Sequence, residues 1–249
     1  MVTAMPHHVL RSKPALPLQK QRGVSLLVVI VIVMIMALLA FWAMRSALFA
    51  ELVTSNEADY QRAYQAAQSM VQDAKDDIVR NLRGEGARDG TTVVQFPEDA
   101  TVFEDWAFGL SAQPTHCQQA LCLRRLDAEN FWDDETSLAA MVAVGARYAQ
   151  YSGMEAGEDI NPILKSTAIN KGAWYWIEPM LFEASQIGSV HNTLTGSSAQ
   201  PVQADMLYRI TAIALGMKGA STNDSDLRQR SPTMAVIQTI VALPTTTGE

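Results

Sequence analysis

The most regular pattern in the chain is an apolar run over residues 24–44, VSLLVVIVIVMIMALLAFWAM, which only Ser25 interrupts. About 20 apolar residues suffice for a helix to cross the hydrocarbon core of a bilayer. A secretory signal peptide has a shorter apolar core, of about 7 to 15 residues, followed by a small-residue cleavage site. The run therefore predicts a transmembrane helix over residues 24–44.

Helical periodicity continues beyond this run, through an amphipathic segment at residues 45–83. Neither Gly nor Pro occurs from Val24 to Arg83, and Gly84 is a suitable C-cap. Apolar residues recur mostly at steps of three or four, which predicts a continuous helix packed on one side. The apolar positions are Leu48, Leu52, Tyr60, Ala63, Ala67, Val71, Ala74 and Ile78, and those expected in solvent are Glu51, Asn56, Glu57, Asp59, Gln61, Arg62, Asp73, Lys75, Asp76 and Asp77.

Three apolar and aromatic runs occur in the last third of the chain, at residues 174–178, 206–215 and 234–243. Polar segments that contain Gly and Pro separate them, which is typical of strands joined by turns. They predict a β-meander at about residues 174–243. The expected fold class is thus α+β, with the long N-terminal helix packed against a C-terminal antiparallel β-sheet.

The middle run shows which face of this sheet is apolar. Tyr208 and Ile210 alternate with Arg209, as in an antiparallel sheet that is covered on one face. Residues 46–80 of the helix are the expected covering element. The linker at residues 216–232 is then an exposed loop, either plainly solvated or available for subunit contacts.

The middle of the chain has a weaker pattern. Residues 92–96 could form a short strand that ends at Pro97. Residues 133–151 predict a helix with Asp134 or Thr136 as its N-cap and Gly153 closing it. Its expected buried face consists of Leu138, Val142 and Ala146.

The charges divide the chain between two compartments. Residues 1–23 hold four of the 19 Lys and Arg residues and none of the 26 Asp and Glu residues. The positive-inside bias therefore predicts a basic leader in the cytoplasm and an exported C-terminal part. That part carries about −11, which argues against nucleic acid as a partner. Its length suits a single periplasmic head domain at residues 84–249.

The two cysteines, Cys117 and Cys122, both lie in the exported part. An oxidising compartment favours a disulfide between them. The alternatives are two reduced thiols or a metal pair completed by His116. Because the exported part has only His116 and His191 as imidazoles, we expect no metal.

A search for catalytic patterns finds no G-x-S-x-G, no H-E-x-x-H and no phosphate-binding loop. Oxygen-rich stretches at residues 155–159 and 223–226 could hold calcium, although surface charge is the simpler explanation. The aromatic triplet at residues 174–176 could stack sugars, but such residues on a strand are more often core. We expect neither an enzyme nor a bound cofactor.

The junction before the apolar run carries a family resemblance. Gln21-Arg22-Gly23 followed by Val24-Ser25-Leu26-Leu27 resembles the class III leader of type IV pilins. Residues 51–68 are similar to the second half of the N-terminal helix of PilX-type minor pilins, and the resemblance covers roughly residues 20–78. It implies cleavage between Gly23 and Val24 by prepilin peptidase and N-methylation of Val24.

One departure from the pilin pattern concerns Val28, the fifth residue after the expected cut. Most major pilins have a glutamate there, thought to pair with the terminal ammonium of a neighbouring subunit inside the apolar filament core. An unpaired charge in such a core costs several kcal/mol. The absence of the carboxylate leads to the hypothesis of a place at or near the filament tip.

The resemblance implies a minor pilin that helps to initiate pilus assembly for adhesion and motility. Its implied partners are other minor pilins, the major pilin, a tip adhesin, prepilin peptidase and the inner membrane platform. Its expected location is the inner membrane, as a single-pass protein, before incorporation into the pilus. One alternative is a type II secretion tip pseudopilin of the GspK kind, and a second is a single-pass anchored periplasmic enzyme or sensor.

Overall fold

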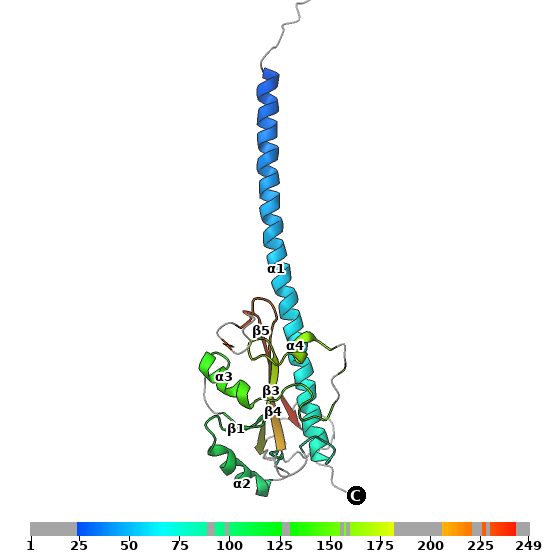
Figure 1. Ribbon diagram of the computed structural model, residues 1–249, viewed down its shortest axis with the longest axis vertical. Coiled ribbons are helices and arrows are strands. Elements are labelled where there is room, and N and C mark those ends of the chain that lie inside the picture. The colour runs from blue at the N-terminus through cyan, green and yellow to red at the C-terminus, as the bar shows by residue number, and fades with distance from the viewer. Residues whose placement is uncertain are drawn as a thin grey trace, which may run out of the picture. The chain divides into compact units, whose positions relative to one another are not determined.

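The computed structural model describes residues 24–88, 93–97, 100–125, 130–154, 157, 160–181, 206–220, 226–227 and 230–242. The chain divides into an N-terminal unit, Met1–Leu52, and a C-terminal unit, Val53–Glu249. Helix α1 (Val24–Leu82) begins in the first unit and ends in the second (Figure 1). In the N-terminal unit α1 is the only element among the described residues, and all its side chains there are exposed.

The C-terminal unit contains a five-stranded sheet in the order β1-β2-β3-β4-β5. Its three long strands, β3 (Ala173–Leu181), β4 (Met206–Leu215) and β5 (Met234–Ala242), are consecutive and antiparallel. The predicted meander and the α+β fold class are therefore confirmed. The strands are rich in β-branched and aromatic residues, which pack well on a pleated surface.

The sheet is mixed, because a small hairpin extends it beyond β3. Strands β1 (Cys117–Gln118) and β2 (Leu121–Cys122) pair antiparallel, while β2 lies parallel to β3 through Leu121 and Ile177. The expectation of a purely antiparallel sheet is corrected in this respect.

Two apolar clusters cover the two faces of the sheet. On one face, α1 packs against Tyr175, Ile177 and Ile210. On the other face, helix α3 (Glu135–Val144) covers Trp174 and Trp176. Alternate residues of β3 thus point to opposite cores, and the expected packing of α1 on the meander is confirmed. Because all three aromatic residues of the 174–176 triplet are fully buried, they are core residues and offer no sugar-stacking platform.

The C-terminal end of α1 follows its sequence signal. Gly84 has a φ of 72°, the left-handed conformation that a glycine adopts without a Cβ clash. Its N–H donates to the Asn81 carbonyl at 3.0 Å, and the Glu85 N–H donates to the Arg80 carbonyl at 2.8 Å. These two bonds form a Schellman motif, so Gly84 is the predicted C-cap.

The helix expected over residues 133–151 is shorter than its pattern indicated. Asp134 is the N-cap and accepts from the Ser137 N–H at 2.7 Å, as predicted, but α3 ends at Val144. Ala146 instead pairs with Tyr175 through backbone bonds of 3.0 and 3.1 Å. A Cβ on Gly145 would lie 2.9 Å from the Trp176 indole, so the chain leaves the helix where only glycine fits.

Two further expectations for irregular segments are corrected. No strand forms over residues 93–96, and Thr92 lies outside the described residues. Phe96 is buried there and contacts the ring of Tyr208 edge-on. Among the described residues of the 216–232 linker, residues 217–219 are exposed as expected, but the Met217 and Lys218 N–H groups donate to Asp59 of α1, so this part of the linker is not simply a solvated loop. Helix α2 (Ala100–Ser111) and the short α4 (Pro162–Lys165) complete the described elements.

Candidate assembly helix and its joint with the sheet

The N-terminal unit presents an apolar helix surface with no protein partner among the described residues. Residues 24–44 carry large exposed hydrophobic side chains on every side of α1. In the described part of the chain, α1 is the one helix long and apolar enough to span a membrane. An apolar surface that surrounds a helix is stable in lipid or among other apolar helices.

The structure places only some of the residues predicted for processing. Val24 is the first residue of α1, and Gly23 and the rest of the basic leader, residues 1–23, lie outside the described residues. Val28 is in the first two turns of the helix, and the first turn contains no acidic residue. The helix start therefore offers no carboxylate to a neighbouring ammonium group.

Within the C-terminal unit, three carboxylates of α1 face the protein interior. Asp59, Asp73 and Asp77 are 2%, 3% and 0% exposed. This corrects the expectation that all three lie in solvent. They belong to the line Asp59, Ala63, Ala66, Met70, Asp73 and Asp77, whose steps of four and three keep one face of the helix.

Asp77, which is the closest of the three to the C-terminal end of α1, forms a buried ion pair. The Arg88 guanidinium donates from Nε to Asp77 Oδ1 and from Nη2 to Asp77 Oδ2, both at 2.8 Å. The Tyr175 hydroxyl also donates to Asp77 Oδ2 at 2.8 Å. Burial raises the pKa of Tyr175 well above its ordinary value, and the neighbouring Asp77 carboxylate adds to that effect. Tyr175 therefore remains a neutral donor to this carboxylate.

Arg88 makes further contacts that connect the ion pair to its surroundings. Its guanidinium donates to the carbonyl oxygens of Val94 at 3.2 Å and Gln119 at 3.0 Å. The guanidinium carbon lies 4.1 Å from the centre of the Tyr151 ring and 5.2 Å from that of Phe96. This planar, bidentate arrangement suits arginine and not lysine.

Asp73, which lies between the other two carboxylates along α1, forms hydrogen bonds with the turn that follows α3. Asp73 accepts from the Ala149 N–H at 2.8 Å and from the Ser152 hydroxyl at 2.5 Å. Burial raises the pKa of Asp73 to about 6, although both hydrogen bonds act in the opposite direction. The desolvation of the carboxylate is therefore only partly offset by its donors.

Asp59, which is the closest of the three to the N-terminal end of α1, forms hydrogen bonds with the start of the 216–232 linker. Asp59 accepts from the Met217 N–H at 3.0 Å and from the Lys218 N–H at 3.3 Å. A Cβ on Gly216 would lie 2.1 Å from Asp59 Oδ2, so this approach requires glycine. The three aspartates thus fix three separate segments of the C-terminal unit to one helix face.

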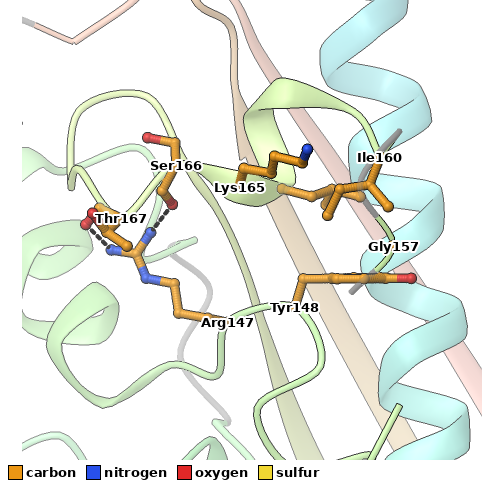
Figure 2. Close-up of a pocket in the computed structure, with 8 residues that line it drawn as sticks. Arg147, Tyr148, Gly157, Ile160, Lys165, Ser166 and Thr167 are labelled. Carbon is orange, nitrogen blue, oxygen red and sulfur yellow. Dashed lines mark hydrogen bonds between the residues drawn. The ribbon is translucent and has the colours of Figure 1, made fainter. Parts of the chain in front are cut away.

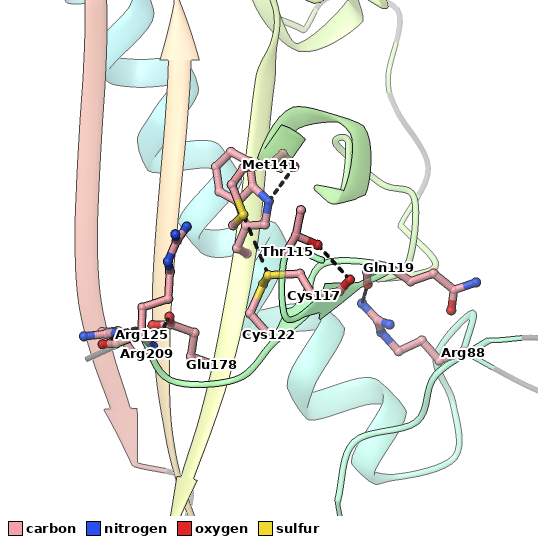
Figure 3. The surroundings of a disulfide bond; sticks show 10 residues. Arg88, Thr115, Cys117, Gln119, Cys122, Arg125, Met141, Glu178 and Arg209 are labelled. Atoms are coloured by element: carbon pink, nitrogen blue, oxygen red, sulfur yellow. Dashed lines mark hydrogen bonds and ion pairs between the residues drawn. A yellow bond between two sulfur atoms is a disulfide. The ribbon is translucent and has the colours of Figure 1, made fainter. Parts of the chain in front are cut away.

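The cysteines predicted to pair form a disulfide, Cys117–Cys122. It closes the β1–β2 hairpin, whose turn residues Gln119 and Ala120 have φ values of 50° and 67°. These left-handed conformations are uncommon for residues other than glycine. Figure 3 shows the hairpin beside Arg88, which contacts the Gln119 carbonyl. With both sulfurs in the disulfide, the alternatives of free thiols and of a metal pair with His116 do not apply.

A small pocket of about 460 Å³ lies beside α4 (Figure 2). The Arg147 guanidinium at its edge donates to the carbonyl oxygens of Ser166 and Thr167, both at 2.6 Å. It also lies 4.7 Å from the Trp174 ring centre, and burial lowers its pKa. Arg147 thus braces the loop after α4. The other lining residues are Tyr148, Gly157, Ile160, Leu164 and Lys165, which provide no nucleophile–base pair.

Metal ligands do not gather in the described part of the chain, where no group of three His, Cys, Asp or Glu residues could hold an ion. Of the oxygen-rich stretches considered for calcium, residues 155–156, 158–159 and 223–225 lie outside the described residues. The predictions of no metal, no cofactor and no catalysis therefore stay predictions.

These features define a class of protein: an α+β unit built on the second part of a long helix whose first part is apolar throughout, as in type IV pilins. The family model described as PilX N-terminal matches residues 22–72. The match confirms the predicted resemblance of this segment to PilX-type minor pilins. Neither the curated proteins nor the solved structures contain a match to the chain.

The buried aspartates and Arg88 are the residues that sequence reasoning missed. A signal for the aspartates was present, because Asp59, Asp73 and Asp77 continue the three-and-four spacing of the buried alanines. Assigning every carboxylate to solvent concealed it. Arg88 had no such signal, since it lies in an irregular, Gly-rich stretch after the helix.

Proposed function

We propose that this chain is a minor type IV pilin that helps to initiate pilus assembly and lies at or near the filament tip. The PilX N-terminal match over residues 22–72 supports the pilin class. The observation that carries the tip position is Val28, an apolar residue where the resemblance implies a glutamate in shaft subunits. The protein acts through assembly and not through catalysis.

Assembly requires α1 to exchange lipid for other helices. Lipid tails and apolar side chains are similarly apolar, so the detail of packing selects the partners. Val28 cannot neutralise the terminal ammonium of a subunit ahead of it. A subunit without the carboxylate is disfavoured in the repeating shaft, where a buried unpaired ammonium costs several kcal/mol, and tolerated where no subunit lies ahead.

The proposed route to the filament begins at the inner membrane. The basic leader stays in the cytoplasm and the C-terminal unit is exported. Prepilin peptidase then cuts between Gly23 and Val24, and the new terminus is N-methylated. The partners along this route are the inner membrane platform, other minor pilins, the major pilin and a tip adhesin.

Intact-mass analysis of the membrane-extracted protein tests the processing. The expected mass corresponds to the loss of residues 1–23 plus one methyl group. A full-length chain would contradict the pilin route and favour the anchored enzyme or sensor.

Labelling of sheared filaments tests the position. The native protein is expected at filament ends, and the Val28→Glu variant is expected along the shaft as well. A conservative apolar substitution in the same turn, Val29→Ile, serves as the control and should leave the label at the filament ends. Native protein distributed evenly along the shaft would overturn the tip position.

A further inference from the structure

Aromatic residues are unevenly distributed along the apolar run of α1. None occurs among residues 24–40, whereas Phe41 and Trp42 stand together near the C-terminal end of the run. The first charged residue of the helix, Arg45, follows directly after the run, and Phe49 lies four residues further on. These four residues are here named the aromatic-arginine cluster.

The side chains of the cluster lie on one side of the helix. At about 100° per residue they fall within an arc of about 100°, because Phe41, Arg45 and Phe49 follow one another at steps of four. The Arg45 guanidinium carbon lies 5.6 Å from the centre of the Phe49 ring, which is a cation–π arrangement. All four side chains are exposed, that of Trp42 at 77%. The cluster therefore offers a cation and flat rings to whatever surrounds α1 at this level.

The opposite side of α1 differs in size over residues 40–50. It carries small side chains, among them Ala43, Ala47 and Ala50. Helices in membranes approach one another closely through small residues, and four large side chains prevent such an approach on the side of the cluster. Trp and Arg collect instead where hydrocarbon meets headgroups, because each has an apolar body and a polar end. The composition of the cluster thus favours lipid over a second helix.

The distance along α1 places the cluster at the boundary of a bilayer. From Val24 to Trp42 the helix rises about 27 Å at about 1.5 Å per residue, and the hydrocarbon core is about 30 Å thick. When Val24 lies at one boundary of the core, Trp42 therefore lies at the other, with Arg45 about one turn beyond it. At this depth a guanidinium can bind phosphate oxygens in a bidentate way, and an indole N–H can donate to a headgroup oxygen.

From these observations we propose that the aromatic-arginine cluster binds the phosphate-bearing headgroups of the leaflet at the C-terminal end of the span, and thereby sets the depth of α1 in the membrane. The proposal rests on the proposed function only in taking residues 24–44 to cross a membrane. It goes beyond that function by assigning the boundary of the span to four residues and lipid phosphate to them as ligand.

Quenching of Trp42 fluorescence measures its depth in the purified full-length protein, reconstituted in phosphatidylcholine vesicles. The lipid is brominated either close to the headgroup or close to the end of the acyl chain. The signal of Trp42 is the difference between the native protein and the Trp42→Phe variant, since the other tryptophans belong to the C-terminal unit: Trp106, Trp132, Trp174 and Trp176.

Bromine close to the headgroup should quench this difference signal at least about twofold more than bromine close to the acyl-chain end. Stronger quenching by the deep bromine would overturn the proposal. Absence of quenching at either depth would also overturn it, because protein and not lipid would then cover the cluster.

The Arg45→Ala variant tests the role of the guanidinium. Without a charge to hold at the phosphates, the helix is free to slide, and bromine at the two depths should quench Trp42 about equally. Arg62→Ala, which removes an exposed arginine of the same helix in the C-terminal unit, is the matched control and should keep the native ratio. An unchanged ratio in Arg45→Ala would overturn the binding of headgroups by this residue.

Inorganic phosphate distinguishes a lipid headgroup from a free anion. Added to the protein in dodecyl maltoside, a detergent without phosphate, it should leave the Trp42 signal unchanged. A change that Arg45→Ala abolishes would identify free phosphate as the ligand and overturn the assignment to lipid. Failure of the proposed function is a separate result, because intact mass reports the pilin route, whereas the depth of Trp42 is measured in vesicles without other pilus subunits.

Discussion

Residues 24–52 and residues 59–78 lie in the same helix, α1, and differ in which of their side chains meet other protein atoms. In the first segment every described side chain is exposed, and apolar residues surround the helix. In the second, small residues such as Ala63 and Ala66 bury one face, and buried aspartates interrupt that face. One helix thus leaves its apolar side chains exposed in one segment, and in the other it packs small apolar residues and hydrogen-bonded carboxylates against its own chain.

Removal of the Asp77 carboxylate should destabilise the C-terminal unit more than any other change considered for α1. Asp77→Ala leaves Arg88 charged, buried and unpaired, which costs about 3 to 5 kcal/mol in the free energy of unfolding. Urea unfolding of the detergent-solubilised chain measures the loss, with the fluorescence of buried Trp174 and Trp176 as the signal. Asp76→Ala, one position away and less buried, is the control and should change stability by less than about 1 kcal/mol. A decrease of less than about 1 kcal/mol in the free energy of unfolding of Asp77→Ala would show that the ion pair with Arg88 does not stabilise the packing of α1 in the C-terminal unit.

The contribution of Asp73 to stability should depend on pH. Because burial raises the pKa of Asp73 from 3.8 to about 6, the folded state binds a proton more tightly than the unfolded state does. The contribution of Asp73 is therefore most favourable below about pH 4, declines as the pH rises to about 6, and is constant above. The change amounts to at most about 3 kcal/mol.

The Asp73→Asn variant provides the reference for this pH series. The difference between native and variant unfolding free energies should vary between pH 4 and 6 in that direction. A difference that is independent of pH would contradict the raised pKa.

Removal of the disulfide should have a smaller effect on the stability of the C-terminal unit. Removing the short Cys117–Cys122 loop should cost about 2 kcal/mol, because the unfolded chain regains loop entropy. The Cys117→Ala/Cys122→Ala protein, compared with the native protein under oxidising conditions, measures this loss. Under reducing conditions the two proteins should become nearly equal in stability, and a persistent difference would show that the sulfur packing, and not the bond, stabilises the hairpin.

The smallest expected effect comes from the N-terminal segment. Val33→Ala removes an exposed side chain of α1 and should change the unfolding of the C-terminal unit by less than about 0.5 kcal/mol. Val71→Ala, the same substitution on the buried face of the same helix, should cost roughly 2 kcal/mol. Equal effects of the two variants would remove the distinction between the segments.

Much of the fold could be predicted from local patterns. The strands β3 to β5, the N-cap Asp134 and the C-cap Gly84 depend on residues close in sequence, and each lies where its signal indicated. The end of α3 could not be predicted this way. Ala146 suits a helix locally, but its backbone groups pair with Tyr175 in β3.

The contacts of Asp59, Asp73 and Asp77 with the rest of the C-terminal unit were less predictable than the fold. Whether a carboxylate on a helix is solvated depends on donors far away in sequence, such as Ser152 for Asp73 and Lys218 for Asp59. The signals at Gly23, Val24 and Val28 lie within a few residues of each other, and the processing and assembly roles inferred from them stay predictions.

The contact between Tyr175 and Asp77 also constrains the order of folding. The two residues are 98 positions apart, whereas Arg88 is only 11 positions from Asp77. The guanidinium can therefore close its loop with the helix early, and the hydroxyl arrives only when the third strand is placed, after a much larger loss of chain entropy. The buried charge pair receives its last donor in that step. A chain stalled before β3 docks thus has a buried carboxylate that still lacks the hydroxyl donor of Tyr175.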